Sequence, residues 1–535
     1  MNAVLAKVRG TMKISDLQSG FQILARLPLA NSQQAAIEIN AFLDSLLHTP
    51  PDGEVYLQLL EQTRISLCFI GEELSRRYVN KPLPLGDPEA APFKQVVALW
   101  LKAARAYSHC AQLQPNDGGS TAAERLALIL HRCIYYTGMA IGEHHRARQE
   151  LPVGVWLNLH GYYASAEEWG VATVPVADSL DSLGRSSHCT AAYVSLLLAD
   201  LASPYTLSVR DLGLTRRWLC TWSPLVSLHP VLAQQSLPQS VLDLRRDCGL
   251  RTANECLEGD NSRRLDTSRL ATQINQLMRQ LRHRISPAQL GLGEDCTSGH
   301  CYQLLKRLRE RWCTLRAARK FPRHHASGIA RMATGFAAIH YHISGKGFTQ
   351  PGDSSIYSRR EFERLFAFRH SLDPTQLLEV HQVQLGFGLD NWEVLDQSAS
   401  GFRLLRSSVG RKVELGQLLS ICPHDGNTHL LAQVVWMVQE QGGSLVAGVV
   451  ALPGKPRAVA ARPLAPESES SAPYSRAFIL PAVFAIGAEQ TLVLPLGWYR
   501  PERVLEVYAD APMRVKLQSR VDGGADFERA SFVIV

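Results

Sequence analysis

The chain has 535 residues and lacks an apolar run long enough to cross a membrane. A membrane-spanning helix needs about 18 or more apolar residues in succession, and no stretch of this chain reaches that length. Its most apolar stretches, 191–201 and 430–438, are much shorter. Residues 1–10 also lack the apolar core of a secretory signal peptide. We therefore expect a cytoplasmic protein with no membrane span.

The short motifs of the common enzyme classes are also missing. The chain has no Gly-x-x-x-x-Gly-Lys-Ser/Thr loop, no His-Glu-x-x-His, no Gly-x-Ser-x-Gly and no EF-hand loop. The histidine pairs at 144–145 and 324–325 lack carboxylates at metal-ligand spacing, and Cys296, His300 and Cys301 offer three ligands without a fourth. We expect a protein that is not an enzyme and needs no metal or cofactor.

Cysteine is scattered, with an odd count of 11 and no Cys-x-x-Cys pair. In a cytosolic chain, such cysteines are expected to be buried, reduced thiols.

The composition is that of a folded protein, with 46% hydrophobic and 20% charged residues. The length predicts about two to four domains. A net charge of +7 suits a polyanionic ligand but gives no basic stripe that demands nucleic acid.

Residues 1–290 are predicted to be a helical region that serves as an interaction scaffold. Apolar residues recur at spacings of three and four, and the breaks at 48–53, 80–88 and 115–120 are rich in Pro, Gly, Asn and Asp. No period of about 34 residues repeats, so a solenoid-like scaffold and a single irregular helical domain both remain open. The expected helices are 35–47, 55–77, 93–113, 122–141, 153–168 and 191–201.

Residues 205–270 are harder to interpret, and we assign them no role. Within and beside this stretch, 240–245 resembles a strand, and 264–284 resembles a helix that is capped near Asp266 or Thr267.

The most informative segment is an Asp-x-Ser-x-x-Gly turn formed by Asp396, Ser398 and Gly401 between two strand-like stretches. Asp or Ser in a turn can accept hydrogen bonds from a ligand, and the Gly either adopts a positive φ or allows a close approach. Further short strands follow, separated by Gly, Asn and Asp turns, at about 402–405, 410–416, 429–438 and 443–452.

In order and spacing, this region resembles the PilZ domain, a bacterial six-stranded barrel that binds cyclic di-GMP. The family signature pairs Arg-x-x-x-Arg with [Asp/Asn]-x-Ser-x-x-Gly. The resemblance covers about residues 316–455, and we assign 316–460 to the barrel.

Two segments match the arginine half of the signature. Arg319 and Arg323 directly precede the strand-like run 329–343, where the family places its arginines, and we prefer them. Arg360 and Arg364 are the alternative, in surroundings that look helical. With the preferred pair, Arg323 and Asp396 are 396 − 323 = 73 positions apart, which requires an insertion at about 345–390.

The resemblance implies a role for each residue. Arg319 and Arg323 would clamp guanine and phosphate, because a guanidinium can bind the O6 and N7 acceptors, stack on a base and pair with phosphate oxygens. Asp396, Ser398 and Gly401 would line the opposing wall. His340 and His342 fall on one face of an expected strand, 337–343, and need no catalytic role.

The C-terminal part contains a Pro-rich linker at 461–475 and then a further small β unit at 476–535. The predicted fold is therefore multidomain: an all-α N-terminal region, a PilZ-like six-stranded antiparallel β-barrel, and a small β unit.

The corresponding function is a cyclic di-GMP receptor that regulates a protein partner, or its own association, through the helical region. The family resemblance points to motility, attachment or exopolysaccharide control without choosing among them. The alternatives are a ligand-free interaction scaffold and a nucleic-acid-binding regulator that uses the arginine-rich stretch 305–323.

Overall fold

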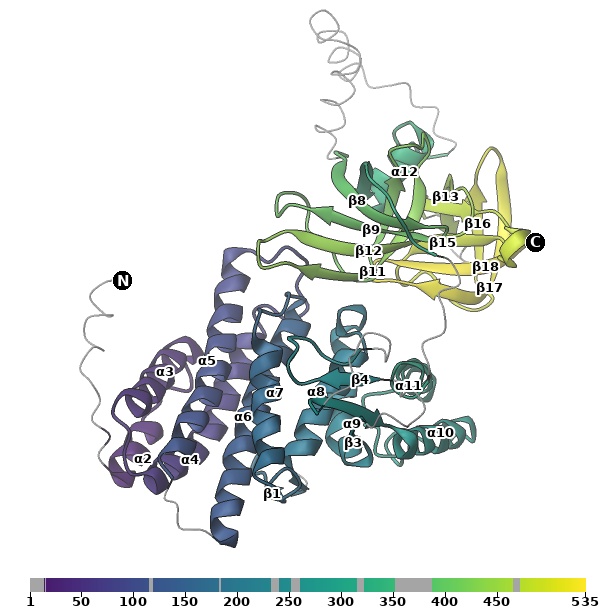
Figure 1. The fold of residues 1–535 in the computed structure, drawn as a ribbon. Helices are drawn as coiled ribbons and strands as arrows, with labels where there is room; N and C mark the ends of the chain where they lie inside the picture. Colours follow the sequence, from purple (N-terminus) through teal and green to yellow (C-terminus); the bar gives the residue numbers. More distant parts are fainter. Residues whose placement is uncertain are drawn as a thin grey trace, which may run out of the picture. The chain divides into compact units, whose positions relative to one another are not determined.

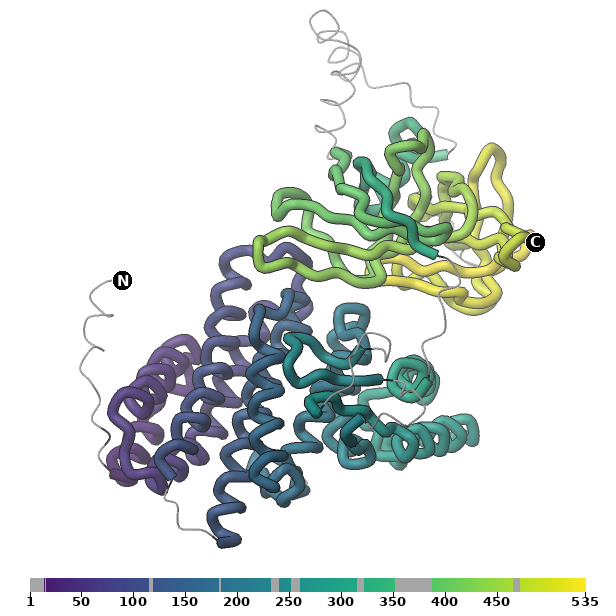
Figure 2. Tube along the Cα trace, viewed as in Figure 1, coloured from purple at the N-terminus to yellow at the C-terminus, as the bar shows by residue number. Residues whose placement is uncertain are grey.

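The computed structural model describes residues 14, 16–114, 119–181, 184–231, 240–251, 260–314, 322–351, 387–464 and 472–535. Its internal contacts divide the chain into two compact units (Figures 1 and 2). The first unit extends to Ala318 but excludes Pro82–Pro84, and the second comprises Pro82–Pro84 and Arg319–Val535.

The first unit is mainly helical, as the apolar periodicity predicts. Helix α5 lies between α4 and α6, and α6 also contacts α7 and α8 (Figure 1). Buried aromatic side chains such as Phe42, Trp100 and Tyr136 fill the core between the first helices. The helices are α2 (Leu17–Ala25), α3 (Ser32–His48), α4 (Gly53–Ser75), α5 (Asp87–Gln112), α6 (Ser120–Ala147), α7 (Val155–Glu168), α8 (Cys189–Leu201) and α9 (Val209–Trp222).

The predicted breaks are where helices begin. Helix α4 starts directly after Asp52, whose side chain accepts a hydrogen bond from the backbone N–H of Glu54. Helix α5 starts within the second break, with Pro88 in its first turn, and α6 starts at the third.

The stretch without an assigned role contributes a three-stranded sheet to the first unit, in the order β3 (Ser227–Pro230), β5 (Ser262–Asp266), β4 (Val241–Asp243). Strand β4 confirms the strand expected at 240–245. Helices α10 (Ser268–Arg282) and α11 (Ser298–Trp312) follow, and α10 begins after Thr267, as expected. Smaller elements are β1 (Val176–Ala177), β2 (Ser186–Ser187), η1 (Pro204–Thr206) and η2 (Ser223–Leu225).

Cys296 and Cys301 form a disulfide, so the expectation of reduced thiols is wrong for this pair. Their Cα atoms are 6.2 Å apart, within the range that a disulfide can bridge. The turn into α11 brings the two residues together, a proximity that a spacing of five residues does not reveal by itself.

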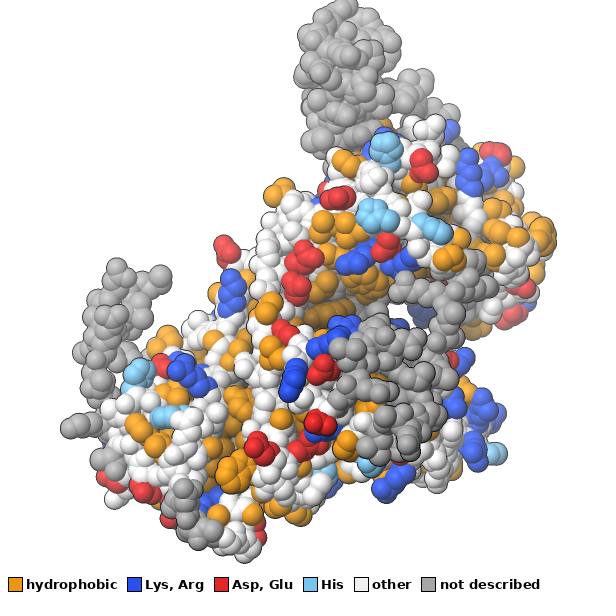
Figure 3. Space-filling model, in the orientation of Figure 1, with side chains coloured by type: hydrophobic (Ala, Val, Ile, Leu, Met, Phe, Trp, Pro, Cys, Tyr) orange, Lys and Arg blue, Asp and Glu red, His pale blue; other side chains and the backbone are white. Residues whose placement is uncertain are grey.

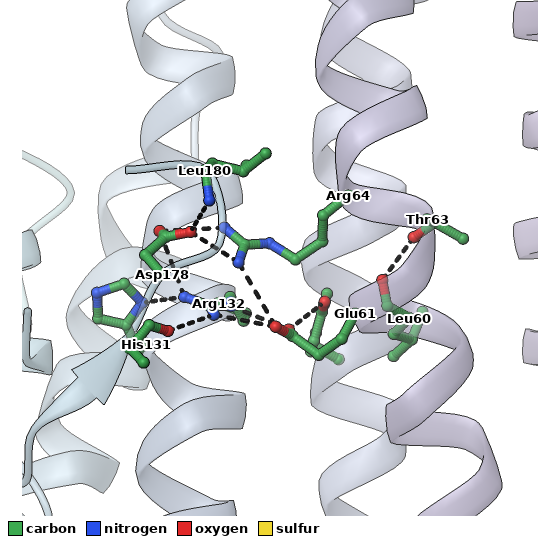
Figure 4. A network of polar contacts seen from close by, with 10 residues as sticks. Leu60, Glu61, Thr63, Arg64, His131, Arg132, Asp178 and Leu180 are labelled. Carbon is green, nitrogen blue, oxygen red and sulfur yellow. Dashed lines mark hydrogen bonds and ion pairs between the residues drawn. The ribbon is translucent and has the colours of Figure 1, made fainter. Parts of the chain in front are cut away.

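A buried ion-pair network joins α4, α6 and the loop after β1 (Figure 4). Arg132 makes two hydrogen bonds to the Glu61 carboxylate, at 2.9 and 3.0 Å. Arg64 binds Asp178 at 2.8 Å and also reaches Glu61 at 3.5 Å. Both arginines are fully buried, and removing their charges from water is costly. The ion pairs with Glu61 and Asp178 offset this cost.

The second unit contains the predicted six-stranded antiparallel barrel. Strands follow in the order β8-β7-β10-β11-β12-β9, and the pairing of β9 with β8 closes the ring. The two-residue strand β6 (His324–His325) is added beside β8. The barrel strands are β7 (Ile329–Thr334), β8 (Asp390–Ser398), β9 (Gly401–Arg406), β10 (Leu418–Cys422), β11 (Leu430–Gln439) and β12 (Leu445–Ala451).

The predicted small β unit is a second closed barrel in the order β13-β14-β15-β18-β17-β16. Its first strand begins at Arg457, so the boundaries drawn at 460 and 476 were placed too late. One apolar cluster includes Leu418 and Leu431 of the first barrel with Phe478 and Val493 of the second. The strands are β13 (Arg457–Pro463), β14 (Ser475–Leu480), β15 (Thr491–Pro495), β16 (Val504–Tyr508), β17 (Pro512–Gly523) and β18 (Phe527–Ile534), with the 3-10 turn η4 (Phe484–Ile486).

Two expected strands of the first barrel are wrong. Residues 337–343 belong to helix α12 (Phe336–Ser344), because Gly335, with φ of 83°, ends the extended chain after β7. The stretch 410–416 is a loop in which only Val413 makes a bridge, to Leu83. The expected insertion at 345–390 falls mainly on residues 352–386, outside the described part of the chain.

Candidate functional site

The Asp-x-Ser-x-x-Gly turn is a tight hairpin between β8 and β9. Ser398 pairs with Gly401, which leaves Ala399 and Ser400 as the two turn residues. The Ser398 hydroxyl lies 3.4 Å from the backbone nitrogen of Ser400, which donates to it, and 3.4 Å from the Gly401 carbonyl oxygen, to which it donates. Both contacts are long for hydrogen bonds, so the hydroxyl is only weakly engaged by the turn.

Gly401 is required by a close approach of backbone. The sequence left two explanations for this glycine, a positive φ or a close approach. Gly401 does not have a positive φ, so the close approach is the explanation. An added Cβ would lie 2.3 Å from the carbonyl oxygen of Val449 on β12. Gly401 therefore allows β9 to approach and pair with β12.

The two halves of the signature meet through Arg323 and Asp396. Arg323 Nη1 lies 2.8 Å from Asp396 Oδ1, and these side chains remain 30% and 21% exposed. Strand β6 positions the arginine, because His325 pairs with Asp396 along the β6–β8 ladder. The 73 positions between Arg323 and Asp396 are thus bridged by direct strand pairing.

The structure adds a second arginine beside Asp396. Arg403 on β9 is the direct cross-strand partner of Asp396, next to an irregularity in β8 between Val394 and Asp396. Directly opposed residues share one face of a ladder, and the Arg403 side chain is exposed. The sequence does hold this signal, since counting outward from a two-residue turn pairs Ser398 with Gly401 and then Asp396 with Arg403.

Other predicted arginines fall outside the described residues. These are Arg319, Arg360 and Arg364, so the choice between the two Arg-x-x-x-Arg segments stays a prediction.

His340 and His342 do not share a face, because they lie on a helix and not on a strand. The His340 ring contacts Phe348 and Phe478, whereas the His342 ring stacks on His429 at 5.2 Å. Burial lowers the pKa of His340 and of His429 to about 4, so both rings are neutral at neutral pH. Among the described residues, no group of three His, Cys, Asp or Glu side chains could hold a metal ion.

Three family models match the chain in consecutive order. The model "Cyclic-di-GMP receptor FimW, N-terminal domain" matches residues 19–234, and "Cyclic-di-GMP receptor FimW, middle PilZ domain" matches 247–365. This chain carries a PilZ domain. The matched PilZ segment includes both candidate arginine pairs, Arg319 with Arg323 and Arg360 with Arg364, and it ends before Asp396. The model "FimW C-terminal beta-barrel domain" matches 459–535, which is most of the second barrel.

A curated relative agrees with these matches. The Cyclic-di-GMP receptor FimW of Pseudomonas aeruginosa is 24% identical over 514 residues, covering 88% of this chain and 82% of the relative. The similarity therefore extends well beyond the PilZ domain. No helix among the described residues is both long and apolar enough to span a membrane.

Proposed function

We propose that this chain is a cytoplasmic receptor for cyclic di-GMP, with a ligand site on the first barrel formed by Arg319, Arg323, Asp396, Ser398 and Gly401. The observation that carries the proposal is the contact of 2.8 Å between Arg323 and Asp396, which joins both halves of the signature on one partly exposed surface. The similarity to a protein described as a cyclic di-GMP receptor supports it.

The chemistry of these side chains suits the ligand. A guanidinium has five N–H donors, and the contact with Asp396 uses one nitrogen of Arg323 and leaves other donors for a guanine edge or a phosphate. Asp396 also holds Arg323 in place, and its other oxygen can accept hydrogen bonds from guanine N–H groups. The chain thus binds and senses the dinucleotide without catalysing a reaction.

Ligand binding is expected to act on the helical unit through the segment that contains Arg319 and Arg323, because this segment directly connects α11 to β6 in the chain. A ligand shifts an equilibrium only when it binds two states with different affinity. Ordering or repacking of this segment would supply that difference, and the helical unit would pass it to a protein partner or a second copy.

Calorimetric titration of the purified chain with cyclic di-GMP tests the proposal, with GTP as the control. Saturable binding of cyclic di-GMP alone is the expected result. Failure to bind would favour the alternative function, an interaction scaffold that keeps the barrel as a docking surface.

The arginine substitutions have separate expected effects. Arg323→Ala and Arg319→Ala should each weaken cyclic di-GMP binding by about 1.5–3 kcal/mol, because each removes charge-assisted contacts. Arg360→Ala and Arg364→Ala are the matched controls and should change the titration little. The reverse pattern would assign the clamp to the second segment.

Ser398→Ala should weaken binding by about 1 kcal/mol through the loss of one hydroxyl contact. The thermal midpoint of the ligand-free protein should hardly change, because the hydroxyl makes only two contacts of 3.4 Å within the turn. Thermal scans with and without ligand separate the two effects, since bound ligand raises the midpoint by mass action. A large loss of stability with intact affinity would make Ser398 a structural turn residue.

A further inference from the structure

Helices α10 and α11 carry a large excess of positive charge. Helix α10 contains three arginines and no acidic residue, and α11 contains four Lys or Arg residues and one Glu. The two helices pack against each other, and blue side chains gather around α10 on the face drawn in Figure 3. This charge lies in the first unit, on elements that the barrel site does not include.

A cavity of about 300 Å³ lies where these helices meet. Arg279 and Arg282 of α10 and Arg309 of α11 line it, together with Asn275 and Met278. The lining thus contains three guanidinium groups and no carboxylate. None of the three arginines forms an ion pair with another described residue.

Two of the arginines show how the cavity is built. Arg282 lies over the Tyr302 ring, 5.1 Å from its centroid, and donates a hydrogen bond to the Tyr302 hydroxyl. Arg309 has a buried Nε with no hydrogen-bond partner among the described residues. The three guanidinium groups that line the cavity carry like charges, and an anion in the cavity would offset the repulsion between them.

We propose that this cavity is a second anion site that takes a phosphate group, separate from the dinucleotide site on the barrel. Guanidinium groups match phosphate geometry and bind it in a bidentate manner. A volume of about 300 Å³ is at the small end of ligand pockets, which favours a compact phosphorylated molecule or a phospholipid headgroup over a nucleic-acid duplex.

Titration of the full chain with inorganic pyrophosphate at low ionic strength tests the site. Saturable binding is expected, and Arg279→Gln and Arg309→Gln should each weaken it about tenfold, because each removes a charge-assisted contact. Arg269→Gln is the matched control, since Arg269 is an exposed residue of α10 outside the cavity lining, and should change binding less than about twofold. Unchanged thermal midpoints would show that the variants fold.

Vesicles identify the source of the phosphate. Binding to phosphatidylglycerol vesicles but not to phosphatidylcholine vesicles, weakened by Arg279→Gln, would support a lipid headgroup, whereas binding of pyrophosphate without vesicle binding would support a soluble ligand.

Three results would overturn the proposal. The first is no saturable binding of either probe. The second is an equal loss in Arg269→Gln, or DNA binding spread evenly over the basic residues of both helices, because either would indicate general charge attraction. The third is a loss of cyclic di-GMP binding in Arg279→Gln as large as that in Arg323→Ala, which would make the cavity part of the first site.

Discussion

Gly401→Val is expected both to abolish cyclic di-GMP binding and to destabilise the first barrel by about 3 kcal/mol. The added Cβ would lie 2.3 Å from the Val449 carbonyl oxygen, and a β-branched side chain places two methyl groups beyond it. The obstacle is backbone, which cannot rotate away as a side chain could. Strands β9 and β12 must therefore separate, and this disturbs the hairpin that holds Asp396 and Ser398.

Thermal unfolding and calorimetric titration of the same preparation measure both effects. Gly442→Val is the matched control in the same barrel, because a Cβ at Gly442 meets no atom within 4 Å and its φ is not positive. That control should bind normally and unfold within a few degrees of the parent protein. Normal binding and stability in Gly401→Val would show that the signature glycine does not serve strand pairing.

The hairpin at the site is the part of the barrel that the sequence predicts best. The Asp-x-Ser-x-x-Gly pattern with strand-like flanks places the turn correctly, and β8 and β9 follow on either side. The pairings of β9 with β12 and of β7 with β10, which complete the ring, came only through the PilZ resemblance, because no local pattern states which distant strands pair.

The errors have physical causes. A short apolar run such as 336–343 fits a buried strand and a buried helix equally well, and here a helix forms. The boundary drawn at 460 divided β13 between the first barrel and the linker, because the Pro-rich composition of the stretch was taken to mark a linker. In both cases the structure that forms depends on tertiary partners elsewhere in the chain. Phe478 packs against α12, and β13 pairs with β14 and β16.

The candidate site was only partly predictable for the same reason. The contact between Arg323 and Asp396 depends on β6, which has two residues and leaves no periodic signal. Arg403 was missed although hairpin counting reaches it. A site that strand pairing assembles in this way is best tested one residue at a time. Arg403→Ala is a further variant, and it should weaken cyclic di-GMP binding if this face of the barrel holds the ligand.

Arg132→Met is expected to destabilise the helical unit by about 3–5 kcal/mol, because it leaves two carboxylates with one cation. Arg132 makes two hydrogen bonds to Glu61 and one to the Ala177 carbonyl oxygen. Burial acts to raise the pKa of Glu61, but hydrogen bonding to Arg132 and the charges of Arg132 and Arg64 lower it overall. Without Arg132, the Glu61 side chain, only 28% exposed, would lose most of this compensation.

Denaturant unfolding followed by the circular dichroism of the helices measures the change, and Arg76→Met is the surface control. Arg76 pairs with Glu73 at 3.0 Å but is 74% exposed, so its loss should cost less than about 1 kcal/mol.

The double variant Arg132→Met with Glu61→Met separates charge from packing, because it leaves the balanced pair Arg64 and Asp178. If the unpaired Glu61 carboxylate causes the loss of stability, the double variant should be more stable than Arg132→Met alone. Substitutions within one ion-pair network are often non-additive in this way. A double variant that loses at least the sum of the two single effects would show that these side chains stabilise the unit by packing between α4 and α6, and that the paired charges contribute little.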